Sequence, residues 1–264
     1  MTIDPARALT TAQAIISERY PGADFAFVAG SIMRGEGTQF SDIDLVVIYR
    51  ALPAAYRESF QFAGVPIEAF VHDPDTLEWF IDQDAARGRP GLFAMVAEGV
   101  VIGKRAPMAR AMQSRIKARL AAGPPPLSPE QRESLLYRVG DLVDDLRAER
   151  TPAEQTAIGA GLYAPLAELS LRGRGCWNGA GKWIPRLLKQ SAPELAARFE
   201  QAFTTLFTRG DTKAILALAE EEIARQGGPV FKGFRRDAPP TARRDARSPL
   251  AAEGDPLAAA RDRG

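Results

Sequence analysis

Two aspartates separated by one residue, Asp42 and Asp44, stand at the start of an apolar segment rich in β-branched residues, 43–49. Alternate residues of a strand leave from the same face, so this spacing predicts that the two carboxylates project together. Two such charges about 5 Å apart repel each other by about 3 kcal/mol at an effective dielectric near 20. A divalent cation between them would offset the repulsion, so the pair indicates a metal site.

Glu68 is the third acid of this candidate site. It alternates with the apolar residues Ile67 and Ala69, a pattern typical of a strand. If that strand pairs beside residues 43–49, Glu68 reaches the same point in space. Three carboxylates suit one or two Mg²⁺ ions, with Mn²⁺ as an alternative, which would also hold the phosphates of a nucleotide. The single cysteine, Cys176, and the single histidine, His72, exclude ligand sets that need several of either within one chain.

The glycine and serine at positions 30 and 31 supply a candidate phosphate-binding turn. Gly30 ends an apolar segment, 25–30, and lets the backbone approach an anion closely. Ser31 would begin a helical turn whose free N–H groups point at that anion, and Arg34, one turn later, adds a cation. The loop lacks the Gly-Lys-Ser/Thr ending of a Walker A motif.

Other protein classes also use Asp-x-Asp, and the surrounding residues argue against each. Haloacid-dehalogenase-like enzymes place the pair after an apolar strand, whereas here the apolar segment follows Asp42. Glycosyltransferases give no role to a Gly-Ser pair ten residues upstream. An EF-hand loop needs a ligand where this chain has Val46. A solvated pair of acids at a strand start is the remaining interpretation, and Gly30-Ser31 together with Glu68 disfavours it.

The first part of the chain reads as alternating helices and strands. Apolar spacing predicts a helix over 5–19 and strands over 25–30 and 43–49. Residues 58–71 predict two strands joined by a turn at Gly64 to Pro66. A helix then begins from a cap at Asp73 or Asp75, a short helix lies near 90–98, and a last strand covers 100–103.

The rest of the chain predicts helices only. A basic helix within 108–123 is followed by a proline-rich break with Ser128 as a cap. Further helices are predicted over 129–150, 153–173, 182–190, 193–208 and 211–226. The fold class is therefore α+β, a mixed β-sheet with flanking helices followed by an all-α helical bundle. We expect domains at 1–104 and 105–230 and a disordered tail over 231–264.

The motifs Gly30-Ser31, Arg34-Gly35 and Ser41-Asp42-Ile43-Asp44-Leu45 resemble the signature of the DNA polymerase β nucleotidyltransferase superfamily. They are most similar to the aminoglycoside nucleotidyltransferases of streptomycin/spectinomycin type and to the minimal nucleotidyltransferases. The segment 66–73 resembles the strand that carries the third acid in the first group, where a helical domain follows the catalytic one. In the second part of the chain the resemblance rests on this architecture and on Arg172 and Lys182.

This resemblance implies a nucleotidyltransferase-type mixed sheet and two-metal transfer of a nucleoside monophosphate, AMP from ATP or another NTP, to a hydroxyl group. Asp42, Asp44 and Glu68 would be the catalytic and metal-binding residues, and Glu68 is either a metal ligand or the general base. The implied nucleotide-binding residues are Gly30, Ser31, Arg34, Ser41, Arg172 and Lys182.

The partner that accepts the nucleotide is left open between two hypotheses. The first is a small hydroxylated molecule such as an aminoglycoside, which acidic residues at 141, 144 and 145 would attract unless they form an ordinary solvated helix face. The second is a regulatory module of the minimal-nucleotidyltransferase kind that modifies or binds a protein or a tRNA. The acceptor, the preferred NTP and the oligomeric state are open.

Composition narrows the remaining possibilities. The formal net charge is +1, and the basic helix within 108–123 lacks interleaved aromatics, so there is no strong nucleic-acid signal. No window approaches the roughly 20 apolar residues that span a bilayer, so no membrane partner is expected. The first residues carry acids and lack a signal-peptide pattern; with one cysteine, this predicts a cytoplasmic protein. The segment 179–183, Gly-Ala-Gly-Lys-Trp, is either a phosphate-binding turn or a helix connection with Trp183 in the core.

Overall fold

The computed structural model describes residues 3–239 of the 264-residue chain. Its strands are β1 (Phe25–Ala29), β2 (Ile43–Ile48), β3 (Tyr56–Phe62), β4 (Val65–His72) and β5 (Val100–Gly103). They form one five-stranded sheet within the described residues, in the order β3-β4-β2-β1-β5. The β2–β4 pair is parallel and the other pairs are antiparallel. The predicted mixed sheet is therefore confirmed.

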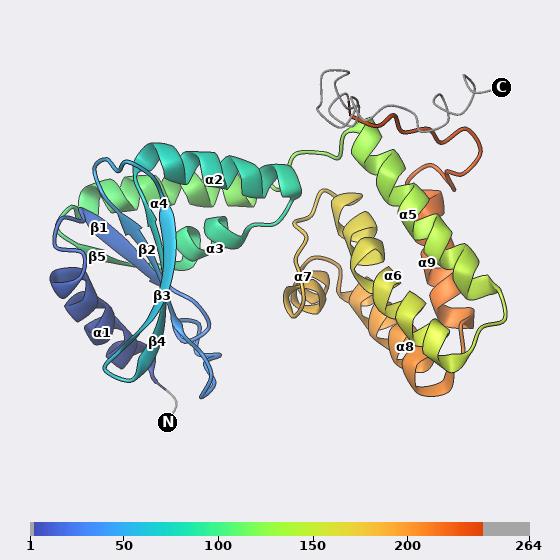
Figure 1. Ribbon diagram of the computed structural model, residues 1–264, viewed down its shortest axis with the longest axis horizontal. Helices are drawn as coiled ribbons and strands as arrows, with labels where there is room; N and C mark the ends of the chain where they lie inside the picture. The colour runs from blue at the N-terminus through green and yellow to red at the C-terminus, as the bar shows by residue number, and fades with distance from the viewer. Residues whose placement is uncertain (1–2, 240–264) are drawn as a thin grey trace, which may run out of the picture. The chain divides into compact units, whose positions relative to one another are not determined.

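Helices cover both faces of this sheet (Figure 1). Helix α1 (Pro5–Glu18) packs on one face, with Ala8, Ala12 and Ile15 buried at helical spacing. Helices α2 (Pro74–Arg87), α3 (Gly91–Glu98) and α4 (Ala106–Ala121) pack on the other. Both layers bury apolar side chains, so the inner strands β1 and β2 read as nearly continuous apolar segments, whereas the edge strand β3 is largely polar.

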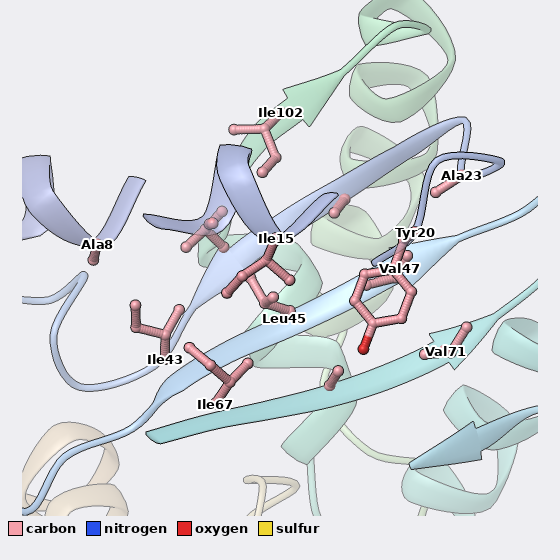
Figure 2. Packing of buried hydrophobic residues seen from close by; sticks show 14 of the residues in the cluster. Ala8, Ile15, Tyr20, Ala23, Ile43, Leu45, Val47, Ile67, Val71 and Ile102 are labelled. Carbon is pink, nitrogen blue, oxygen red and sulfur yellow. The ribbon is translucent and has the colours of Figure 1, made fainter. Parts of the chain in front are cut away.

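The two faces of β2 belong to two separate cores. Figure 2 shows Ile15 of α1 near Leu45 and Val47, and all three are fully buried in one cluster. Val46 and Ile48 instead join the cluster formed with α2, α3 and α4. Because successive side chains alternate, Asp44 projects on the same side as Val46. The fold thus directs this carboxylate toward the face that carries α2, α3 and α4.

The second part of the chain is helical, as predicted. Its helices are α5 (Pro129–Arg147), α6 (Pro152–Arg172), α7 (Trp183–Ser191), α8 (Pro193–Arg209) and α9 (Lys213–Arg225). Helix α6 packs against α5, α7, α8 and α9, which confirms a helical bundle. Met1–Pro229 form one compact unit, so the division between residues 104 and 105 stays a prediction. Across residues 3–239, no helix combines the length and the apolar character needed to cross a membrane.

Reciprocal caps set three of the described helix starts. The side chains of Asp73, Ser128 and Thr151 each accept a hydrogen bond from the backbone N–H three residues later, and the backbone N–H of each cap donates to the side chain of that later residue. These reciprocal bonds satisfy N–H groups that a helix leaves unpaired at its start. The cap of α2 is therefore Asp73 rather than Asp75, and the predicted cap at Ser128 is confirmed.

Some predicted boundaries were wrong. The turn predicted at Gly64 to Pro66 lies at Ala63 and Gly64, which have φ angles of +48° and +78°. Two positive φ angles favour a two-residue hairpin, so Pro66 lies within β4. The helix predicted to reach residue 150 ends at Arg147. Residues 231–239 of the predicted tail form neither helix nor strand, and residues 240–264 lie outside the described part of the chain.

Candidate active site

The parallel pairing of β2 with β4 brings two of the three acids opposite each other. Asp44 is in register with Glu68, and Ile43 with Ile67. Registered residues of neighbouring strands share a face, and Asp42 immediately precedes β2. One carboxylate oxygen from each of Asp42, Asp44 and Glu68 lies within 4.8 Å of the other two. The three side chains converge as their spacing predicted; that they bind a metal stays a prediction.

The dimensions and chemistry of this cluster fit a magnesium ion. Mg–O distances are about 2.1 Å, so three oxygens within 4.8 Å of one another can reach one ion once their side chains adjust. All three acids are partly exposed, which leaves room for phosphate oxygens as further ligands. The donors are carboxylate oxygens only, as hard cations prefer.

Burial and the neighbouring acids together disfavour the ionised form of Asp44. Burial, followed by the charges of Asp42 and Glu68, raises the pKa of Asp44 to about 6. Arg34 and Arg57 act in the opposite direction and lower this pKa. Because the two guanidinium groups compensate only in part, the cluster favours a further positive charge.

Gly30 shapes the wall of the cluster beside Asp44. It follows Ala29, which is in antiparallel register with Asp44, and its φ angle is +95°. A β-carbon at this position would overlap Oδ2 of Asp44. Glycine is therefore required twice, by the backbone conformation and by the close approach of the carboxylate.

The loop after Gly30 is tied at both ends. A turn follows, in which the N–H of Glu36 donates to the carbonyl of Ser31 over 2.9 Å. The hydroxyl of Ser31 donates to Oγ of Ser41 over 3.0 Å, and this oxygen also accepts the N–H of Thr38 over 2.9 Å. Ser41 therefore anchors the loop directly before Asp42. The predicted roles of Gly30, Ser31 and Ser41 toward a nucleotide stay predictions.

Arg34 connects this loop to two other elements. Its guanidinium lies 3.3 Å from Oε2 of Glu98 at the end of α3 and 3.4 Å from Oε2 of Glu36. It also lies 5.0 Å from the centroid of the Trp183 ring at the start of α7. Since its charge lowers the pKa of Asp44, Arg34 is close enough to act on the acids.

Lys182 directly precedes Trp183 and occupies the N-cap position of α7 without a side-chain capping bond. Arg186, in the first turn of α7, lies 5.1 Å from the Trp183 ring and pairs with Glu36 over 3.0 Å. The start of α7 is thus beside the loop that follows Gly30. The interpretation of Trp183 as a core residue is wrong, because its ring is partly exposed and packs against two arginines.

Arg172 occupies a different environment from the other predicted nucleotide-binding residues. Only 5% of it is exposed, and its Nη2 donates to the carbonyl of Pro125 over 2.8 Å. Its guanidinium fills the space where a side chain at Gly88 would lie, and burial lowers its pKa. These contacts lie at Pro125 and Gly88 rather than at the three acids, so a contact with nucleotide stays a prediction.

Arg57 is a site residue that the sequence analysis missed. Its Nε donates to Oε1 of Glu68 over 2.9 Å, its Nη2 contacts the same oxygen, and its guanidinium lies 5.0 Å from the Phe70 ring centroid. The hairpin register pairs Arg57 with Phe70 and Ser59 with Glu68, so Arg57 is the diagonal neighbour of Glu68. A turn at Gly64 to Pro66 would have put Glu68 opposite Phe62, so the misplaced turn concealed the contact.

This chain is similar to known proteins in part of its sequence and in its structure. Residues 10–80, which include Gly30 and all three acids, match the family model described as a nucleotidyltransferase domain. A nucleotidyltransferase-like protein from Exiguobacterium sibiricum 255-15 is similar in structure, with a TM-score of 0.43 and 13% sequence identity. The similarity covers 82% of this chain and 73% of that protein. No curated protein sequence matches the chain.

Proposed function

Because residues 10–80 carry a nucleotidyltransferase domain of the DNA polymerase β type, we propose that this chain moves a nucleoside monophosphate from an NTP, with ATP as the expected donor, to a hydroxyl acceptor. The observation that carries this proposal is the register of Asp44 with Glu68, which gathers three carboxylates beside the turn at Gly30 and Ser31. A cluster of acids next to a glycine turn supports binding of a triphosphate together with its cations.

Each part of the site has a role in this proposal. Asp42 and Asp44 hold Mg²⁺, or Mn²⁺, which when bound stabilises negative charge on the oxygens around the α-phosphorus. The backbone at Gly30 and Ser31 lies against the phosphates, and Arg34 adds a cationic contact. We assign Lys182 as a further cation for the phosphates, and the contact of its neighbour Trp183 with Arg34 supports this role.

The reaction exchanges one phosphorus–oxygen bond for another. The acceptor oxygen bonds to the α-phosphorus while the bond to the bridging oxygen of the β-phosphate breaks, and pyrophosphate leaves with that electron pair. The acceptor hydroxyl loses its proton to a base. Glu68 either accepts this proton or serves as the third ligand, and both roles need its carboxylate to face the cluster.

We expect the acceptor to be a small hydroxylated molecule such as an aminoglycoside. The acidic face of α5 adds less to this hypothesis than its sequence suggested. Asp144 pairs with Arg147, and Asp145 pairs with Arg150 over 2.7 Å. These arginines neutralise much of the negative charge that would attract a polycation.

The test is transfer of labelled nucleotide. Purified full-length chain is incubated with Mg²⁺, each α-labelled NTP and three classes of acceptor, namely hydroxylated small molecules, proteins including the chain itself, and tRNA. We expect pyrophosphate release and label on a small molecule, with ATP preferred. Label on protein or tRNA would favour the regulatory alternative, and no transfer with any combination would contradict the proposal.

A matched pair of variants controls this test. Asp44→Asn removes one acid of the cluster and is expected to reduce transfer at least about a thousandfold, as loss of a charge-stabilising group does in other active sites. Asp75→Asn makes the same chemical change at an exposed position in the first turn of α2 and should leave activity unchanged. Equal activity of the two variants would overturn the assignment of Asp44.

A further inference from the structure

We propose that Arg57 is a positioning residue, which holds one oxygen of Glu68 and thereby turns the other toward the cation site. This inference rests on the proposed function, since it assigns Glu68 to a metal-dependent site. It adds a residue on the edge strand β3 to a site otherwise built from β1, β2, β4 and the loop after Gly30.

The contact between the two side chains has a defined geometry. Nε and Nη2 of Arg57 both contact Oε1 of Glu68, so the guanidinium occupies a single carboxylate oxygen. The carboxylate contributes one ligand atom to the cluster with Asp42 and Asp44. Because Arg57 contacts Oε1, we assign Oε2 to the cation.

Arg57 is held in this position from a second side. Its guanidinium lies 5.0 Å from the centroid of the Phe70 ring, two residues after Glu68 on β4. The side chain of Glu68 is 18% exposed, although that of Arg57 is 62% exposed. A planar guanidinium engaged by a carboxylate and an aromatic face has less freedom than an ordinary surface ion pair.

The direction in which removal of Arg57 changes metal affinity distinguishes a positioning role from a purely electrostatic one. Arg57 is a cation beside three acids, so by Coulomb's law alone its removal should tighten the binding of a divalent cation. If Arg57 orients Glu68, its removal should weaken binding despite that gain. Residues that orient metal ligands typically affect metal affinity by about 10- to 100-fold.

The experiment measures binding of Mn²⁺ alone to the full-length chain, by isothermal titration calorimetry or by electron paramagnetic resonance of the free ion. The variants are Arg57→Gln, Arg57→Lys, Asp44→Asn and the control Arg19→Gln. Arg19 forms a comparable ion pair with Glu58, which neighbours Arg57 on β3 but projects to the opposite face. Its guanidinium also lies over an aromatic ring, that of Phe60, at 4.3 Å.

We expect Arg57→Gln to bind Mn²⁺ at least about tenfold more weakly than the wild type, and Arg57→Lys to recover part of that loss. Arg19→Gln should bind as the wild type does. Unchanged or tighter binding by Arg57→Gln, or weaker binding by Arg57→Lys than by Arg57→Gln, would overturn the proposal, because charge alone would then govern affinity.

The variant Asp44→Asn allows the positioning role of Arg57 to be tested separately from the proposed function. If the wild type binds Mn²⁺ and Asp44→Asn does not, the metal site stands, and the Arg57 variants decide the positioning role alone. If the wild type itself binds no Mn²⁺, the metal-dependent function and the positioning role both fail. Circular dichroism and thermal melting of each variant exclude loss of folding as the cause of weak binding.

Discussion

The α-carbon of Gly30 packs so closely against the carboxylate of Asp44 that a β-carbon at position 30 would overlap Oδ2. This relationship joins the phosphate-binding turn to the acid cluster, because one residue defines both. A substitution at Gly30 therefore disturbs the site from inside, without touching an acid.

Gly30→Ala is expected to abolish transfer and to destabilise the fold by about 1–3 kcal/mol, since the new side chain adopts a strained φ of +95° and displaces Asp44. Gly35→Ala is the matched control. Gly35 has a similar φ of +74°, but a β-carbon there meets no atom within 4 Å. Pyrophosphate release and thermal melting of both variants check the prediction. Equal loss of activity in the two would show that backbone strain, not overlap with Asp44, is responsible.

Asp44 should make the metal-free protein less stable as pH rises. Its folded pKa of about 6 lies above the ordinary value of 3.8, so the folded state holds a proton that the unfolded state releases. Its stabilising contribution is therefore present below about pH 4 and lost as pH rises through about 6. At about pH 8, without metal, Asp44→Asn should be more stable than the wild type by roughly 1–3 kcal/mol. Melting curves at several pH values measure this, and a less stable Asp44→Asn at high pH would contradict it.

Trp183→Ala removes the ring that lies 5.0 Å from the guanidinium of Arg34 and 5.1 Å from that of Arg186. An exposed cation–π contact contributes about 0.5–1 kcal/mol, so we expect KM for the NTP to rise about two- to fivefold with a smaller change in kcat. Trp79→Ala removes an exposed tryptophan of α2, which makes an edge-to-face contact with Phe80, and serves as the control. Steady-state kinetics of both variants test this. An equal rise in KM for Trp79→Ala would remove the special role of Trp183.

The ion pair between Arg174 and Glu222 should stabilise the helical part of the chain. Glu222 is fully buried, and its two oxygens accept hydrogen bonds of 2.5 Å and 2.7 Å from Arg174. Arg174→Ala leaves a buried carboxylate whose remaining ion pair among residues 3–239 is with Arg225 at 3.8 Å, which should cost about 3 kcal/mol of folding free energy. Arg198→Ala, which breaks the exposed pair with Glu221, should cost less than about 1 kcal/mol. Thermal or urea unfolding measures both, and similar losses would contradict the prediction.

The sequence by itself determined what depends on near neighbours along the chain. Short apolar segments located β1 and β2, alternation of polar and apolar residues indicated the strand of Glu68, and Asp-x-Asp required two carboxylates on one side of the chain at the start of β2. The cap at Ser128 and the order of the helices were equally local, because caps and helical periodicity involve residues three or four apart. The α+β architecture and the nucleotidyltransferase resemblance followed from these patterns.

Only the tertiary structure decided what depends on register and packing between distant segments. The parallel pairing of β2 with β4 put Glu68 opposite Asp44, and the position of the hairpin turn put Glu68 opposite Ser59 rather than Phe62, so that Arg57 contacts Glu68. Packing of the helices buried Arg172 and placed Trp183 beside Arg34. The spacing of residues along one strand does not specify its register with a neighbouring strand. A shift of one residue in that register moves every side chain of the strand to the opposite face of the sheet, although the sequence pattern is unchanged.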